Sequence, residues 1–143
     1  MGPVSSGSRD NPTSAGTFAL NWRSTGRAST VDPDWFMRWY FNFGNREGLA
    51  FHAYSLPGYP ASHGCIRLLE RDALWLFEWG QTWVLDPSGT RVLKMGTPVF
   101  IVGRYNFDAA ELSSTARSAR KQDRSLGTVI APAAFGKTSC ARG

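Results

Sequence analysis

The residues best suited to covalent chemistry in this chain are Cys65 and the histidines that precede it. The sequence contains only two histidines, His52 and His63, and both lie within 13 positions of Cys65. A thiol is a strong nucleophile only as the thiolate, and a neighbouring histidine can make that form available near neutral pH. This spacing predicts a cysteine nucleophile served by a histidine base.

The order of these residues along the chain also suggests which groups cooperate. Gly64 has no side chain, so a substrate can approach closely and the amides of Gly64 and Cys65 can converge on an oxyanion. His63 is two positions before Cys65, and in an extended chain such neighbours stand roughly 6.5 Å apart. His52 comes from a separate strand and can face the thiol at roughly 3 Å. We therefore expect His52 to transfer the proton.

Other interpretations of these residues stay open at this point. Cys65 could be a buried, unreactive thiol, or it could pair with Cys140 in a disulfide. Histidine and thiolate are also zinc donors, but only Cys140 or a carboxylate could complete a set of four ligands. Arg67 could bind a substrate carboxylate or form an ion pair at the surface.

The elements that must position these residues are predicted to be mainly strands. Aromatic residues dominate 35–43 and apolar residues dominate 48–54. The two segments are typical of paired strands across Gly44 and Asn45. His52 then lies on the second strand.

The segments around this pair contain turn-forming residues. Residues 55–61 include two prolines and a glycine and predict a loop that leads to Ser62. A short strand is expected at 17–22. Residues 1–16 and 24–34 are rich in residues that favour turns.

One helix is expected, at 69–79. Apolar residues recur there at helical spacing, and Gly80 is a plausible stop. The apolar stripe consists of Leu69, Ala73, Leu76 and Phe77.

The remaining segments predict a compact domain with a tail. Residues 82–85 and 90–93 are expected to form a hairpin, and 97–102 a final strand. We expect one domain over 1–111. The serine-, alanine- and arginine-rich residues 112–143 predict a flexible tail.

Composition limits the possible partners. Sixteen Lys and Arg residues against eleven Asp and Glu give a net charge of +5, which suits an anionic partner. The sequence has no basic stripe with interleaved aromatic residues, which is the pattern that would indicate nucleic-acid binding. No apolar run approaches the roughly 20 residues that cross a bilayer, and the first residues lack the apolar stretch of an export signal. We expect neither nucleic-acid binding nor stable membrane insertion.

The segment 51–68, FHAYSLPGYPASHGCIRL, resembles the active-site signature of the L,D-transpeptidase catalytic domain (YkuD-type) family. That signature is a histidine, a variable loop, Ser/Thr-His-Gly-Cys, an apolar residue, and Arg or Asn. Upstream, residues 4–7 and 11–18 are similar to the family's substrate-side segment, so the resemblance runs from about 4 to 102. The matching residues here are His52, Ser62, His63, Gly64, Cys65, Ile66 and Arg67.

The resemblance implies a fold and an activity. The fold would be mainly β, a twisted sheet or sandwich with one principal α-helix. Cys65 would attack the bond between diaminopimelate and D-Ala of a tetrapeptide stem, His52 would protonate the departing D-Ala, and the acyl group would pass to an amine. His63 and Gly64 complete the implied catalytic set. The implied substrate-binding residues are Ser62, Arg67 and Tyr54.

The resemblance also implies partners and a location. Peptidoglycan stem peptides would be the substrate and a carbapenem a possible inhibitor, with no metal or organic cofactor, in the periplasm or cell envelope. The acyl acceptor and the oligomeric state are left open. An L,D-carboxypeptidase that uses water, and an inactive wall-binding domain, are the alternatives.

Three features depart from the family pattern. Ala53 stands where the family usually has Gly, which narrows the local backbone freedom. The loop from His52 to Ser62 is short, which predicts a more open groove on that side. The family's first strands have no counterpart, which predicts an exposed sheet edge.

Overall fold

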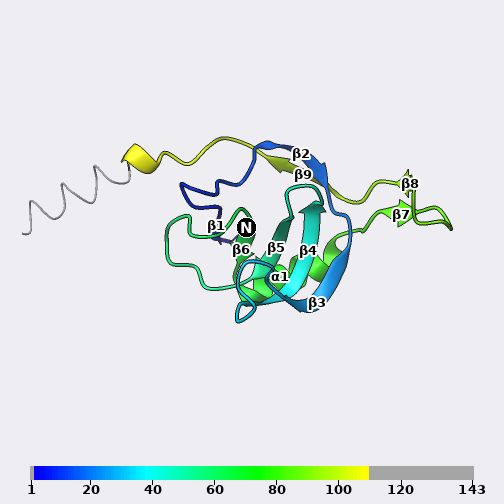
Figure 1. Ribbon diagram of the computed structural model, residues 1–143, viewed down its shortest axis with the longest axis horizontal. Coiled ribbons are helices and arrows are strands. Elements are labelled where there is room, and N and C mark those ends of the chain that lie inside the picture. Colours follow the sequence, from blue (N-terminus) through cyan, green and yellow to red (C-terminus); the bar gives the residue numbers. More distant parts are fainter. Residues whose placement is uncertain (1, 110–143) are drawn as a thin grey trace, which may run out of the picture. The chain divides into compact units, whose positions relative to one another are not determined.

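The computed structural model describes residues 2–109 (Figure 1). The chain divides into two units, residues 1–105 and 106–143, and the fold below is that of the first. In the second unit, the described residues are 106–109, where the Ala109 amide donates to Asn106 Oδ1 at 3.0 Å. The tail expected at 112–143, including Cys140, lies outside the described residues, so its flexibility stays a prediction.

The central element is a five-stranded sheet. Its parallel pair joins β5 (Leu49–Ala53) to β6 (Ile66–Leu68), and the other pairings are antiparallel. The predicted pairing of 35–43 with 48–54 is confirmed, with a turn at 45–48. From edge to edge the order is β1 (Val4–Ser5), β6, β5, β4 (Phe36–Gly44) and β3 (Arg23–Ala28).

The helix α1 (Glu70–Trp79) packs against β4 and β5. Its predicted position is confirmed, and it stops where the Gly80 amide donates to Leu76 O at 2.8 Å. Ala73, in the predicted apolar stripe, is only 1% exposed. The fold is mainly β with one principal helix, as the resemblance implied.

Two small sheets complete the described fold. The predicted hairpin is confirmed as β7 (Val84–Leu85) paired with β8 (Val92–Lys94). The predicted last strand is β9 (Pro98–Ile101), which pairs with β2 (Gly16–Ala19).

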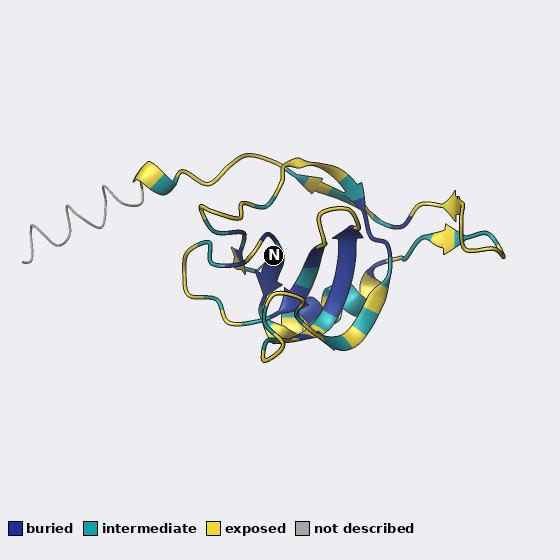
Figure 2. Ribbon diagram, viewed as in Figure 1, coloured by how far each residue is buried: buried dark blue, intermediate teal, exposed yellow. Residues whose placement is uncertain are grey.

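The middle strands of the central sheet are the most buried part of the fold (Figure 2), and two apolar clusters pack against them. The larger core includes Leu20, Phe41, Phe43 and Ala73, so it lies between the sheet and α1. A second cluster forms around Met37, Tyr40 and Ala50, with Trp22 and Cys65 packed against it.

Two predictions about the first part of the chain were wrong. Residues 24–34 were expected to form turns, but Arg23–Ala28 is strand β3. Residues 1–16 were expected to be loop, but Val4–Ser5 pairs with β6, and Gly16 begins β2. β1 and β3 are the edge strands of their sheet. Each forms by backbone pairing with one neighbouring strand, and its sequence has no alternating apolar pattern that would predict it.

A β-bulge in β4 directs side chains to the two faces of the sheet. Arg38 pairs with Ala53 but Phe41 pairs with Phe51, so β4 carries one extra residue at this point. Trp39 takes a positive φ of 53° there. As a result, Met37 and Tyr40, three positions apart, belong to the same buried cluster.

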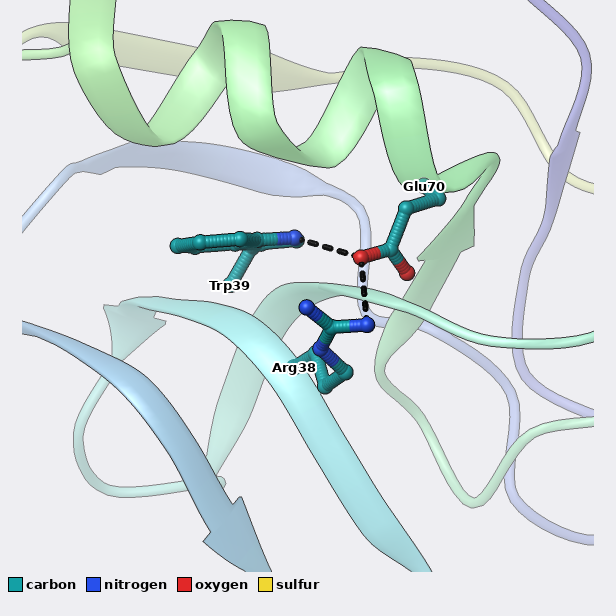
Figure 3. A network of polar contacts seen from close by, with 3 residues as sticks. All are labelled: Arg38, Trp39 and Glu70. Carbon is teal, nitrogen blue, oxygen red and sulfur yellow. Dashed lines mark hydrogen bonds and ion pairs between the residues drawn. The ribbon is translucent and has the colours of Figure 1, made fainter.

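Glu70 at the start of α1 holds the bulge from the helix side (Figure 3). Its Oε1 accepts the Trp39 indole N–H at 2.8 Å and lies 3.0 Å from the Arg38 guanidinium. The carboxylate thereby joins the two residues that precede Tyr40.

We predict that Glu70→Ala lowers the free energy of unfolding by about 1 kcal/mol, because an exposed ion pair and one hydrogen bond are lost together. Glu70→Gln should cost less, since its amide oxygen still accepts the indole N–H. Urea unfolding would measure both. Glu78→Ala, exposed on the same helix, is the matched control; an equal loss in that variant would contradict the role of Glu70.

Candidate active site

The register of the parallel pair places the predicted site residues on one face of the sheet. His52 lies opposite Arg67, and Phe51 lies opposite Ile66. Side chains alternate between faces along a strand, so Cys65, two positions before Arg67, lies on the same face as His52. Phe51 and Ile66 point to the other face and join the core beneath α1. Cys65 directly precedes β6, so His52 and Cys65 lie diagonally across the β5–β6 pair.

A cavity of about 290 Å³ opens on this face. Six of the seven predicted site residues line it, and Gly64 is the exception. These six are His52, Tyr54, Ser62, His63, Cys65 and Arg67.

His52 is buried, with 4% of its surface exposed. Its Nδ1 lies 3.1 Å from Ala53 O, and a carbonyl can only accept, so Nδ1 carries the proton in the neutral ring. Nε2 then has a lone pair that can take a proton. Burial lowers the pKa of His52, the hydrogen bond to Ala53 raises it, and the positive charge of Arg67 lowers it. The ring is neutral near pH 7 and can act as a base.

Cys65 carries a free thiol, and its Sγ lies 3.6 Å from Gly48 O. Burial raises the pKa of Cys65, whereas a hydrogen bond from the Ala50 backbone and the charges of Arg67 and Arg27 lower it. At rest the thiol is therefore protonated. The cavity is therefore lined by an uncharged thiol and an uncharged imidazole.

Hydrogen bonds of the Ser62 side chain stabilise the loop that leads to Cys65. The Ser62 Oγ accepts the Gly64 amide at 3.1 Å and donates to Cys65 O. The expected oxyanion hole of Gly64 and Cys65 amides is therefore revised, because the Gly64 amide already has an acceptor. Gly64 has a φ of 106°, a conformation that favours glycine. Its role in this arrangement is conformational, and the Cys65 amide is the candidate oxyanion donor.

Thr13 supports the same loop from the amino-terminal segment. Its Oγ1 donates to Gly64 O and accepts the Gly7 amide, both at 2.8 Å. Ser62 also accepts the Ser8 amide at 2.9 Å through its carbonyl. This support was not predicted, although Thr13 lies in the segment that resembles the family.

The two histidines occupy different environments. His63 is exposed, and its ring centroid lies 5.4 Å from that of Trp35. His52 is buried on the strand beside the nucleophile. This difference supports His52 as the base.

Arg67 is not at the surface, so its interpretation as a surface ion-pair partner was wrong. It is 8% exposed, and its guanidinium carbon lies 4.7 Å from the centre of the Tyr54 ring. Within residues 2–109, no carboxylate lies within ion-pair distance of it. A buried, unpaired guanidinium at a cavity suits a carboxylate ligand.

Part of the cavity wall was missed by sequence reasoning. Trp22, Arg27, Met37 and Tyr40 line it from β3, β4 and the segment before β3. No local pattern marks them as site residues, because pairing with β4 is what brings β3 to the cavity.

A metal-binding cluster and a membrane-spanning helix are both absent from the described residues. In the range 2–109, no three His, Cys, Asp or Glu side chains are placed to share a metal ion. No helix in this range is long and apolar enough to span a membrane.

Comparisons with known proteins identify a family. The model of the L,D-transpeptidase catalytic domain (YkuD) matches residues 1–101. No curated protein matches the chain.

Solved structures share the fold. An L,D-transpeptidase from Stackebrandtia nassauensis is 22% identical with a TM-score of 0.53, over 71% of this chain and 43% of that one. L,D-transpeptidase 3 from Mycobacterium tuberculosis, with a faropenem-derived adduct, is 23% identical with a TM-score of 0.52, over 71% and 44%. An L,D-transpeptidase in complex with imipenem is 20% identical with a TM-score of 0.54, over 71% and 48%. The chain thus spans less than half the length of these proteins.

We predict a characteristic pH profile for alkylation of Cys65 by iodoacetamide, measured with Cys140→Ala so that one thiol remains. Proton transfer to neutral His52 should give a plateau of reactivity. The plateau should be lost only as pH falls through the lowered His52 pKa, below its ordinary 6.5. A second rise should come above the ordinary thiol value of 9.0. His52→Ala should abolish the plateau and keep the rise; an unchanged plateau would contradict the pairing.

We also predict that Gly64→Ala lowers the free energy of unfolding by about 1–3 kcal/mol, because alanine is strained at this φ. The new Cβ would also lie 3.2 Å from Leu49 Cδ2. Gly58→Ala is the control: its φ is 90° and nothing lies within 4 Å of a Cβ there. Both variants should lose stability by urea unfolding, but only Gly64→Ala should also slow alkylation of Cys65. Normal stability and reactivity in Gly64→Ala would refute its conformational role.

Proposed function

This chain belongs to the L,D-transpeptidase catalytic domain family, and we propose that it is a cysteine-dependent peptidoglycan L,D-transpeptidase. The observation that carries the proposal is the placement of His52 and Cys65 on one face of the β5–β6 pair, in a shared cavity. Arg67 beside them is buried and has no carboxylate at ion-pair distance within residues 2–109, which supports an acidic substrate.

The first half of the reaction forms an acyl-enzyme. His52 Nε2 takes the thiol proton, and the Cys65 sulfur attacks the carbonyl carbon at the L-centre of diaminopimelate in a tetrapeptide stem. The carbon–nitrogen bond to D-Ala breaks, and His52 returns the proton to the departing amine. The product is a thioester on Cys65 and free D-Ala.

The second half transfers the acyl group. An amine acceptor attacks the thioester carbon and gives a proton to His52. The carbon–sulfur bond breaks, and the thiolate recovers its proton from His52. If water replaces the amine, the same steps give a carboxypeptidase. The products distinguish the two: a dimeric muropeptide for transfer and a shortened monomer for hydrolysis.

The supporting residues have separate proposed roles. The Cys65 amide would donate to the oxyanion, and Ser62 would hold Gly64 in the conformation that aims this amide. Ser62 therefore acts by positioning the loop. His63 would contact the substrate at the mouth of the cavity, where its ring meets Trp35.

Arg67 and Tyr54 would act together on the departing side of the substrate. Arg67 lies opposite His52 in the register, and His52 must reach the departing amine. The D-Ala carboxylate is attached to the carbon next to that amine. We assign this carboxylate to the Arg67 guanidinium, with the Tyr54 ring as its support.

The proposed cellular location follows from the proposed substrate. Peptidoglycan lies outside the cytoplasm, so we place the activity in the periplasm or cell envelope. Carbapenems would acylate Cys65 in place of the stem peptide, consistent with the relatives described with imipenem and with a faropenem-derived adduct.

The test uses intact-mass spectrometry after incubation with a carbapenem, and muropeptide analysis after incubation with tetrapeptide stems. We expect one adduct on the wild-type chain and none on Cys65→Ala. His52→Ala should react about a hundredfold more slowly or worse, because the base is lost. His63→Ala should keep measurable turnover and provides the matched histidine control.

Two results would count against this assignment. An unmodified Cys65 in the folded wild-type chain would indicate an inactive wall-binding domain. An inactive His63→Ala beside an active His52→Ala would transfer the role of base to His63.

A further inference from the structure

The cavity contains a second arginine that the proposed reaction does not use. Arg27 on β3 lines it together with Arg67, and both guanidinium groups act electrostatically on Cys65. Among the described residues that line the cavity, Glu47 is the single acid, and it is exposed. Neither arginine lies within ion-pair distance of a carboxylate in residues 2–109. The cavity thus has two unpaired cations for one nucleophile.

Arg27 is held in place by aromatic rings. Its guanidinium carbon lies 5.3 Å from the centre of the Trp22 ring and 5.0 Å from that of Tyr40. The two rings pack against each other at 5.1 Å, and the Tyr40 hydroxyl accepts the Asn42 amide at 3.4 Å. Cation–π contacts use the face of a guanidinium and leave its N–H groups available for an acceptor.

The order of the strands separates the two arginines. Arg67 is on β6, next to the strand of His52, whereas Arg27 is on β3, two strands beyond His52. Neighbouring strands lie about 4.8 Å apart, so β3 and β5 are separated by roughly 10 Å. A ligand that engages both arginines must therefore carry two anionic groups that are well separated from each other.

We propose that Arg27 binds a second carboxylate of the acyl donor, the one at the far end of the retained diamino-acid side chain. This inference rests on the proposed function and adds a specificity determinant to it. Arg67, beside His52, takes the carboxylate of the leaving residue. Arg27 is half-buried and lies further across the sheet. It binds the carboxylate at the end of the diamino-acid side chain, which the methylene groups separate from the reacting carbonyl. The site selects donors in which that carboxylate is free.

The test compares three stem tetrapeptides. One has both carboxylates free, one has a primary carboxamide at the diamino-acid side chain, and one has a primary carboxamide at the C-terminal residue. Release of the C-terminal residue gives kcat and KM for each. For the wild-type chain, amidating the side chain should lower kcat/KM about 10- to 100-fold, mainly through KM, because a charge-assisted contact is lost.

Arg27→Gln should lower kcat/KM for the free donor by a similar factor and leave the side-chain amide donor nearly unchanged. Arg27→Lys should recover part of the discrimination, since it keeps the charge but not the planar fork. Arg91→Gln removes the same charge from the β7–β8 hairpin and should change neither donor. Thermal unfolding of each variant checks that it folds.

Three results would overturn the assignment. They are equal losses in Arg27→Gln for all donors, coupling of Arg27 to the C-terminal carboxylate, and a wild-type chain that does not discriminate against the side-chain amide. A wild-type chain that releases no residue from any donor and forms no carbapenem adduct would instead refute the proposed function.

Discussion

The parallel pairing of β5 with β6 is the constraint on which the site depends. Its register places His52 opposite Arg67, and the alternation of side chains places Cys65 on the same face. The other face of the same two strands supplies Phe51 and Ile66 to the core beneath α1. A shift of one residue would exchange the two faces, so the packing of the core also fixes the geometry of the site.

Burial sets the resting charge state of His52 and Cys65. It lowers the pKa of His52 and raises that of Cys65, so both groups are uncharged at rest. A permanent ion pair at this position would have to overcome the cost of desolvating two charges. Arg67 favours the thiolate and the neutral imidazole alike. The fold therefore favours a neutral resting site in which charge develops on reaction.

Segments far from the nucleophile in sequence keep its loop in position. Thr13 reaches Gly64 O, and Ser8 reaches Ser62 O. On the other side, the bulge at Trp39 brings Tyr40 into the cluster against which Cys65 packs. Glu70 ties that bulge to α1. The cavity thus depends on contacts from the amino-terminal segment, the sheet and the helix together.

Local patterns in the sequence predicted the paired strands, the helix at 69–79 and the grouping of Cys65 with its histidines, because alternation, helical spacing and nearby residues are local properties. The polar edge strand β3 was missed, since backbone pairing with β4 creates it and no apolar pattern announces it. Arg27 was missed for the same reason, because it lies on β3 and reaches the cavity only through that pairing. The Gly64 amide was expected to bind an oxyanion, but its bond to Ser62 depends on the loop's conformation. Sequence alone selected the groups that we propose to react. The tertiary structure decided their burial, their partners and the far wall of the cavity, because those depend on strands that meet only in the folded chain.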